Sequence, residues 1–361
     1  MLRDWSVFVY IFPKSDECRF FVVLWREFCH ASFNGSDRIH SAISSGLGDR
    51  SNGFRAAFFF ASPIHAGNTQ MTVYFSERLA THHPKVFVPA FAALTSNGVE
   101  VKLLDTHRNI WMRDYMPVHT GDHFTKFAYK TFGHGEYDCL RVPRNCWLDF
   151  NPALSRIVLD GGNVVECDSC VLMTRAIFQH NPKQKPADLV RALEVMFEKP
   201  IVLLPMEPGD WLGHADGIAH HIGGNRVLIN DYSGMETKVH AQYQTKIETI
   251  LARAGLEPLL FPFAYHRCPE MSEKKFRVKY PEADDMNPAV GYYINMLIAG
   301  PVVLLPAFGF EEDAEALSVA KILLKGKTVI PIDCFDLAML GGLLHCCSWE
   351  HDEPTTIHAL R

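Results

Sequence analysis

The same order of secondary structure, strand–strand–helix–strand, is predicted several times along this sequence. In one copy, two β-prone runs flank a turn at Asp168 and Ser169, an amphipathic stretch follows at residues 188–198, and an apolar run at 201–204 closes the unit. The copies span residues 71–104, 163–204, 217–262 and 292–331. Repeated units of this kind bury their apolar faces against neighbouring units. The repeat therefore predicts an α/β fold in which a ring of ββαβ units brings the joints between units to a central axis.

Polar clusters occur at the joints between the predicted units, in the segments WMRDYMP (111–117), DGGN (160–163) and GHADG (213–217). Asp114 and Asp216 are suited to a guanidinium group, because carboxylates bind this cation through planar pairs of hydrogen bonds. His214 stands two residues before Asp216, so a strand starting here would place both side chains on one face. Trp111 would form a wall of the pocket and Arg113 would fix the loop. Each cluster alone also has a structural alternative, such as an Arg–Asp surface pair or a structural histidine.

The segment GGLLHCCSW at residues 341–349 places a thiol shortly after a pair of glycines. Such a backbone turns tightly and presents the side chain of Cys346. A thiolate is a nucleophile, a histidine shuttles protons, and carboxylates anchor a cation. A thiol, a histidine and several carboxylates together predict covalent attack on a cationic, nitrogen-rich carbon.

Composition excludes several other classes of protein. The 361 residues carry a formal net charge of -6 and a pI near 6.3, which disfavours a nucleic-acid partner and suits a cationic ligand. The ten cysteines are scattered, unlike a disulfide framework, and predict free thiols in the reducing cytoplasm. The chain lacks the run of about 18 apolar residues that a membrane span needs. We expect no nucleic-acid or membrane partner, and a homo-oligomer is left open.

Residues 1–70 fall outside the repeat, so the sequence divides into a leader and a single catalytic domain at residues 71–361. The apolar run at 6–12 is too short, and too acidic at its flank, for a signal peptide. Two interpretations of the leader stay open. It is poorly ordered or artefactual, or it is an additional element that packs on the domain.

The sequence also contains a CxxC pattern at Cys167 and Cys170. This pattern lies on a predicted hairpin and has no second pair at zinc spacing, which indicates two ordinary thiols. His220 and His221 stand at spacings that do not suit a metal site. Phosphate-binding glycine patterns and the HExxH zinc motif are absent from the sequence. We therefore expect neither a metal nor another cofactor.

Taken together and in this order, these segments resemble the agmatine deiminase and bacterial peptidylarginine deiminase family of guanidine-modifying enzymes. The resemblance runs from Met71 to Trp349, and Met116 and Asp160 depart from the family pattern, which often has glycine and glutamate there. The matching elements are WxRDxxP at 111–117, GGN at 161–163, GHxD at 213–216, YIN at 293–295, PAFG at 306–309 and GGxxxC ending at Cys346.

The resemblance implies a five-bladed α/β propeller, the pentein fold, and a hydrolase without metal or cofactor. It implies that Cys346 is the nucleophile and His214 the general acid and base, while Asp114 and Asp216 bind the guanidinium. Asn295 would lie near the site and hold Cys346 or the substrate. Further substrate-binding residues are expected at Trp111, Arg113, Asp160, Gly162 and Asn163.

The implied reaction is hydrolysis of agmatine to N-carbamoylputrescine and ammonia, a step of putrescine biosynthesis, through a covalent thiouronium on Cys346. Peptidyl or free arginine, which would give citrulline, is the alternative substrate. An amidinotransferase is a more distant alternative on the same fold. An inactive guanidine-binding protein and a zinc hydrolase are alternatives of other classes.

Overall fold

The computed structural model describes residues 6–14, 17–25, 71–104, 110–129, 152–210, 212–235, 238–281, 283 and 287–351. The chain divides into two compact units, Met1–Asn68 and Thr69–Arg361. In the first unit, β1 (Ser6–Lys14) pairs with β2 (Glu17–Trp25) as an antiparallel hairpin, with Ser6 opposite Trp25. The rest of the predicted leader, and the question whether it packs on the domain, lie outside the described residues.

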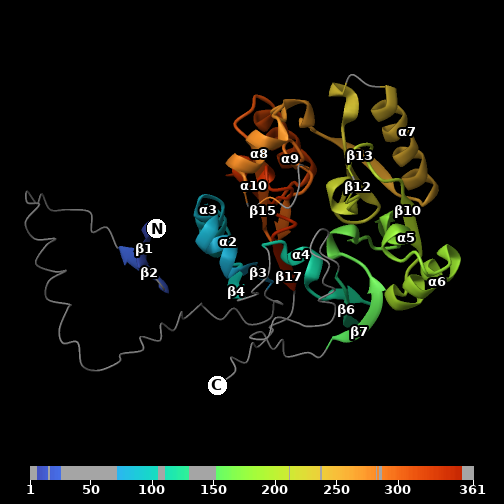
Figure 1. Cartoon of the computed structure of the whole chain (residues 1–361), viewed down its shortest axis with the longest axis horizontal. Helices are drawn as coiled ribbons and strands as arrows, with labels where there is room; N and C mark the ends of the chain where they lie inside the picture. Colours follow the sequence, from blue (N-terminus) through green and yellow to red (C-terminus); the bar gives the residue numbers. More distant parts are fainter. Residues whose placement is uncertain are drawn as a thin grey trace, which may run out of the picture. The chain divides into compact units, whose positions relative to one another are not determined.

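The second unit contains five three-stranded sheets among its described residues (Figure 1). In each sheet the middle strand pairs antiparallel with one neighbour and parallel with the other, as repeated ββαβ units require. The sheets are β17–β3–β4 (Ser348–His351, Thr72–Ser76, Glu100–Leu104), β5–β6–β7 (Val118–Thr120, His123–Ala128, Ala153–Val158), β8–β9–β10 (Val165–Glu166, Val171–Thr174, Ile201–Leu204), β11–β12–β13 (Ala219–His221, Arg226–Asn230, Glu257–Phe261) and β14–β15–β16 (Leu297–Ala299, Val302–Ala307, Thr328–Asp333).

Two features of this arrangement go beyond the predicted repeat. The copy at residues 71–104 lacks a first strand of its own, and β17, from near the C-terminal end, completes its sheet instead. A fifth unit, β5–β6–β7, escaped the sequence analysis because β5 has only three residues and the β6–β7 pairing is irregular. Strands from all five sheets line one pocket, so the sheets surround a common axis, as the predicted ring requires.

A helix connects the second and third strands in four of the sheets and packs against them, as Figure 1 shows for α6 and α7 at the periphery. These helices are α3 (Pro84–Ser96), α6 (Pro186–Phe197), α7 (Lys238–Arg253) and α9 (Glu312–Leu323). In α6, a proline begins the helix and Leu189, Leu193 and Phe197 form a buried stripe at intervals of four residues. The remaining helices among the described residues are α2 (Glu77–His82), α4 (Met112–Tyr115), α5 (Ala176–His180), α8 (Glu273–Lys279) and α10 (Phe335–Ala338).

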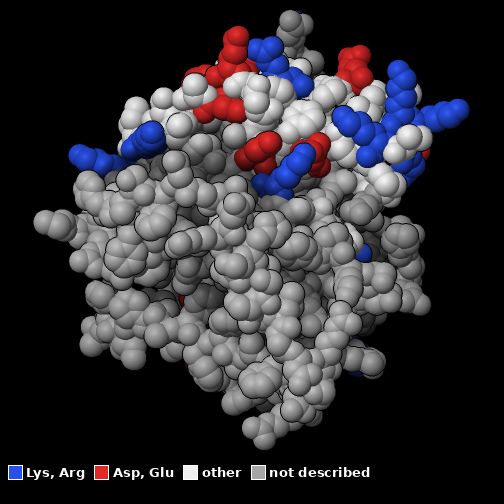
Figure 2. Space-filling view, turned by 90° about the vertical axis from the view of Figure 1, so that its left-hand side faces the viewer, with Lys and Arg blue, Asp and Glu red and all other residues white. Residues whose placement is uncertain are grey.

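The apolar core lies between the sheets and their helices. Its largest cluster contains Phe75 of β3, Leu304 of β15 and Cys347, all with no exposed surface. None of the described helices has the length and apolar character that crossing a membrane would require. In the described part of the face in Figure 2, Lys and Arg side chains are interspersed with Asp and Glu. The five sheets and their core thus hold the polar segments that connect the repeated units.

Candidate active site

Three short turns bring the predicted carboxylates and histidine together near the axis. Asp114 lies in α4, Gly162 in the 3-10 turn Gly161–Asn163, and Asp216 in the 3-10 turn Ala215–Gly217. The Gly162 amide donates to Asp114 Oδ1 at 3.2 Å, and His214 Nδ1 lies 3.6 Å from the same oxygen. His214 Nε2 lies 3.2 Å from Asp160 Oδ2. No strand starts at residue 213: His214 precedes a 3-10 turn, and its ring lies between the carboxylates of Asp114 and Asp160.

The two glycines of the GGN motif allow this close approach. A Cβ on Gly162 would lie 2.7 Å from both Asp114 Oδ1 and His214 Nδ1, and a Cβ on Gly161 would lie 2.0 Å from the carbonyl oxygen of Arg113. Both contacts are shorter than side-chain carbons tolerate. The structure therefore requires glycine at both positions, because neighbouring turns leave no space for a side chain.

Cys346 lies beside this cluster. Its Sγ is 3.3 Å from Asn295 Oδ1 and 3.7 Å from Asp216 Oδ2. Asn295 Oδ1 also accepts the Cys346 amide at 3.3 Å, and Asn295 Nδ2 donates to the Asp216 carbonyl at 3.3 Å. Asn295 therefore links the thiol to the Asp216 turn.

The neighbouring thiol is placed differently. Residues 344–347 form a turn, and the two adjacent thiols have different surroundings. Cys347 is fully buried in the apolar core, and its Sγ points to the Leu344 carbonyl at 3.5 Å. Cys346 alone of the two contacts the polar cluster.

Arg113 holds the backbone that carries the thiol. Its amide donates to the Cys346 carbonyl at 3.0 Å, its Nε donates to the His345 carbonyl at 3.4 Å, and its guanidinium pairs with Glu350. Asn163 also contacts backbone, since its Oδ1 accepts the Thr174 amide at 2.8 Å. The structure thus accounts for both residues as supports of the site, and their contact with substrate stays a prediction.

The ring of Trp111 lies against Gly342, and its expected role as a wall of the pocket stays a prediction. A Cβ on Gly342 would lie 2.5 Å from its ring, so the glycine of the GGxxxC motif leaves room for the indole. The position of His214 depends further on Asp210, whose Oδ2 accepts the Gly213 amide at 2.9 Å while Gly213 has a φ of 64°. Asp210 escaped the sequence analysis, although it stands only four residues before His214.

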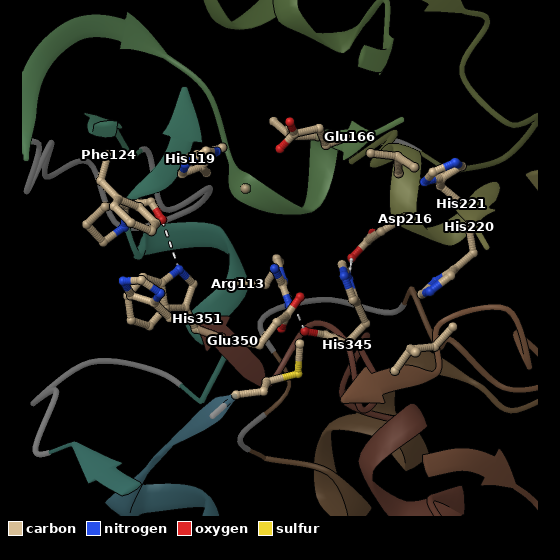
Figure 3. A pocket seen from close by; sticks show the side chains of 18 of the residues that line it. Arg113, His119, Phe124, Glu166, Asp216, His220, His221, His345, Glu350 and His351 are labelled. Atoms are coloured by element: carbon tan, nitrogen blue, oxygen red, sulfur yellow. Dashed lines mark hydrogen bonds and ion pairs between the residues drawn. The ribbon is translucent and has the colours of Figure 1, made fainter. Parts of the chain in front are cut away.

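His345 is the other functional neighbour that the sequence analysis missed, and its only signal was its place before Cys346. Its Nδ1 lies 2.8 Å from Asp216 Oδ2, and Figure 3 shows the ring directed at this carboxylate. The ring of His220 packs edge-on against that of His345, with centroids 5.6 Å apart. Asp216 is therefore in contact with both the thiol and a second histidine.

Burial and neighbouring charges shift the pKa values of Asp114, His214 and Cys346 from their ordinary values. Burial, with the charges of Asp160 and Asp216, raises the pKa of Asp114 to about 7 despite the nearby His214. Burial alone would lower the pKa of His214, but the carboxylates of Asp114 and Asp160 raise it to about 10. Burial, together with the charges of Asp216 and Asp114, raises the pKa of Cys346 well above its ordinary value. Around neutral pH the site therefore combines a protonated thiol with an imidazolium.

Asp216 shifts in the opposite direction. Burial alone would raise the pKa of Asp216. The hydrogen bond from His345 and the positive charges of the neighbouring histidines and Arg113 lower it overall. The two carboxylates differ mainly in their neighbours: Asp216 has a histidine donor of its own, whereas Asp114 shares His214 with Asp160. Such divergent pairs occur at functional sites.

The CxxC pattern is separate from this cluster. The Cys167 amide donates to the Cys170 carbonyl at 2.9 Å across the β8–β9 hairpin, and both thiols are free and buried. Among the described residues, no group of three or more His, Cys, Asp or Glu side chains is arranged to hold a metal ion.

Two proteins that are similar to this chain in sequence have the same name. The protein called "Putative agmatine deiminase" from Marinomonas sp. (strain MWYL1) is 25% identical over 219 residues, which cover 56% of this chain and 58% of that protein. Its namesake from Lactococcus lactis subsp. lactis (strain IL1403) is 20% identical over 203 residues, which cover 53% and 54%. The chain thus spans a little over half the length of these relatives.

Solved structures share the fold. The agmatine deiminase of Enterococcus faecalis superposes with a TM-score of 0.60 at 14% identity, covering 79% of this chain and 94% of that chain. The C. jejuni agmatine deiminase gives 0.59 at 16% identity, covering 81% and 95%. The fold is therefore the α/β pentein. A model of the Porphyromonas-type peptidyl-arginine deiminase family matches residues 62–351, which is most of the chain. The protein thus belongs to the Porphyromonas-type peptidyl-arginine deiminase family.

Proposed function

We propose that this protein is a deiminase that hydrolyses the guanidinium group of agmatine to N-carbamoylputrescine and ammonia. One observation carries the proposal: a cysteine Sγ lies 3.7 Å from a buried carboxylate oxygen, beside a second buried carboxylate that contacts a histidine at 3.6 Å. A guanidinium held between Asp114 and Asp216 would present its carbon to Cys346. The relatives named as agmatine deiminases support this choice of substrate.

Binding of the cation prepares the nucleophile in this mechanism. The positive charge of the guanidinium offsets the repulsion between Asp114 and Asp216. It also favours the ionised forms of Asp114 and of the Cys346 thiol, whose protons pass to solvent. Burial and the charges of Asp216 and Asp114 raise the pKa of Cys346, and a bound cation would offset the charges. Fixing the carbon against Sγ also removes the entropy cost of bringing the reactants together.

The covalent step then forms a carbon–sulfur bond and breaks a carbon–nitrogen bond. The Cys346 thiolate attacks the guanidinium carbon, and the electron pair moves to nitrogen to give a tetrahedral adduct. His214, already an imidazolium, donates its proton to the leaving amino group, and ammonia departs. A cationic thiouronium remains on Cys346.

Hydrolysis completes the cycle. Neutral His214 removes a proton from water, and the hydroxide adds to the thiouronium carbon. The carbon–sulfur bond breaks, the electron pair returns to sulfur, and the remaining oxygen proton passes to the released ammonia. The products are a ureido compound, ammonium and the free cysteine.

An ammonia-release assay tests the proposal. Purified protein is incubated with agmatine, free arginine, a peptide with C-terminal arginine and methylated arginines, with the Cys346→Ser variant as control. We expect ammonia from agmatine and none from the variant. Release from the peptide alone would favour the second candidate, a peptidyl-arginine deiminase, which the matching family model supports. Binding of agmatine without ammonia release would replace the enzyme with a guanidine-binding protein.

A further inference from the structure

The Asp216 residue belongs both to the candidate active site and to the lining of a pocket of about 810 Å³. Strands from all five sheets contribute to this pocket, and Asp216, His345, Arg113 and Glu350 form part of its lining (Figure 3). Cys346, His214 and Asp114 do not line it. The His345–Asp216 pair therefore lines the pocket, whereas the thiol and the acid–base histidine do not.

The two carboxylate oxygens of Asp216 have different surroundings. Oδ2 accepts the His345 hydrogen bond at 2.8 Å. Oδ1 faces the GGN turn, since it would lie 3.4 Å from a Cβ on Gly162, next to Asp114 Oδ1 and His214 Nδ1. Oδ2 thus contacts both His345 and the Cys346 thiol, and Oδ1 is directed to the Asp114–His214 cluster, where the guanidinium would bind.

The side chain and the backbone of His345 make separate sets of contacts. The backbone amide donates to the Asn295 carbonyl at 3.3 Å, and the carbonyl accepts from Arg113 and Ser348. The imidazole makes its separate contacts with Asp216 and His220. A change of side chain at this position therefore leaves in place the hydrogen bonds that fix the Cys346 turn.

We propose that His345 is a positioning residue, which donates its Nδ1 hydrogen to Asp216 Oδ2 and thereby holds Oδ1 toward a bound guanidinium. The proposal rests on the proposed function, because it concerns the cation that Asp216 receives. Without His345, the Asp216 carboxylate is free to rotate and loses a neighbour that stabilises its charge, as the lowered pKa of Asp216 indicates. His345 would then act through Asp216 and not on the substrate.

Alkylation of Cys346 by two reagents of different charge tests this role. Chloroacetamidine carries an amidinium that mimics guanidinium, whereas iodoacetamide is neutral, and each is added to the intact protein. The rate of labelling at Cys346 is followed by mass spectrometry, and the ratio of the two rates reports cation recognition by the carboxylates. Fold and thiol exposure enter both rates and cancel from their ratio.

Four variants distinguish a positioning role of His345 from a purely structural role. His345→Leu removes the donor, and we expect the amidinium preference to fall by about 10- to 100-fold, the scale of a lost hydrogen bond to a charged group. His345→Asn keeps a donor at the Nδ1 position and should retain most of the preference. His345→Gln moves the donor and should lose it. The control His221→Leu removes a histidine from the same pocket without touching Asp216, and should behave like the unmodified protein.

Kinetics with substrate give a second measurement. If His345 positions Asp216, His345→Leu raises KM for agmatine as well as lowering kcat, and His345→Asn restores both. An unchanged amidinium preference in the folded His345→Leu and His345→Gln variants would overturn the proposal. Absence of any amidinium preference in the unmodified protein would instead overturn the guanidinium site, and with it the proposed function.

Discussion

Replacement of Gly162 by alanine tests whether the site depends on the close approach of three turns. The added Cβ would lie 2.7 Å from Asp114 Oδ1 and from His214 Nδ1, whereas ordinary contact begins at 3.4 Å. Both groups must therefore retreat by the difference, about 0.7 Å. Because a misplacement of about 1 Å can cost about 100-fold in rate, we expect kcat/KM to fall by about 10- to 100-fold.

The stability of the same variant should fall by about 1–3 kcal/mol, the usual cost of adding a methyl group to a packed site. Ammonia release and thermal unfolding measure the two effects. Gly234→Ala is a matched control, since its Cβ would meet the nearest ring atoms of His266 at 3.6 Å, an ordinary contact. If Gly162→Ala kept normal kcat/KM, the carboxylate and the histidine would not need the positions seen here, and the proposed clamp would be wrong.

Four further outcomes are expected. Asp216→Asn should lower kcat/KM by at least about 100-fold, because breaking a buried charge pair costs about 3–5 kcal/mol; near-normal ammonia release would remove Asp216 from the cation site. Cys346→Ser should abolish turnover, whereas Cys347→Ser should keep activity and lose about 1–3 kcal/mol of stability from a hydroxyl in an apolar setting; the opposite pattern in paired activity and unfolding assays would reassign the nucleophile. The pKa of His214 is raised from 6.5 to about 10, so its contribution to stability is complete below pH 6.5 and is lost as the pH rises through 10. The Tm of the substrate-free protein should fall over that window, and a fall of equal size in His214→Asn would contradict this origin. A shortened chain beginning at Met71 should unfold cooperatively and keep its ammonia release; aggregation or a large loss of Tm would show that the preceding residues stabilise the domain.

The sequence by itself determined the repeating unit and most of its elements. The predicted helix at 188–198 and strand at 201–204 correspond to α6 and β10, at Pro186–Phe197 and Ile201–Leu204. These features depend on apolar spacing and on the proline that begins the helix, which are local properties of the chain. The motif residues also lay at joints, and their order was sufficient to indicate the family.

Closure of the ring was decided by tertiary structure. β17 pairs with β3 although the two strands stand at opposite ends of the domain in sequence. The three residues of β5 carry too little pattern to indicate a strand by themselves, and they become one by pairing with β6. Strand pairing depends on which backbones meet in space, and periodicity does not report this.

The environment of the candidate site was likewise decided only in three dimensions. His345 and Asp216 are 129 residues apart in the chain, and their contact at 2.8 Å gives Asp216 a lowered pKa while that of Asp114 rises to about 7. Gly162 has no room for a side chain because two other turns approach it. Residue types and spacing identified the chemical groups, but burial and charge, which depend on every neighbour in space, determined the protonation state in which each group is held.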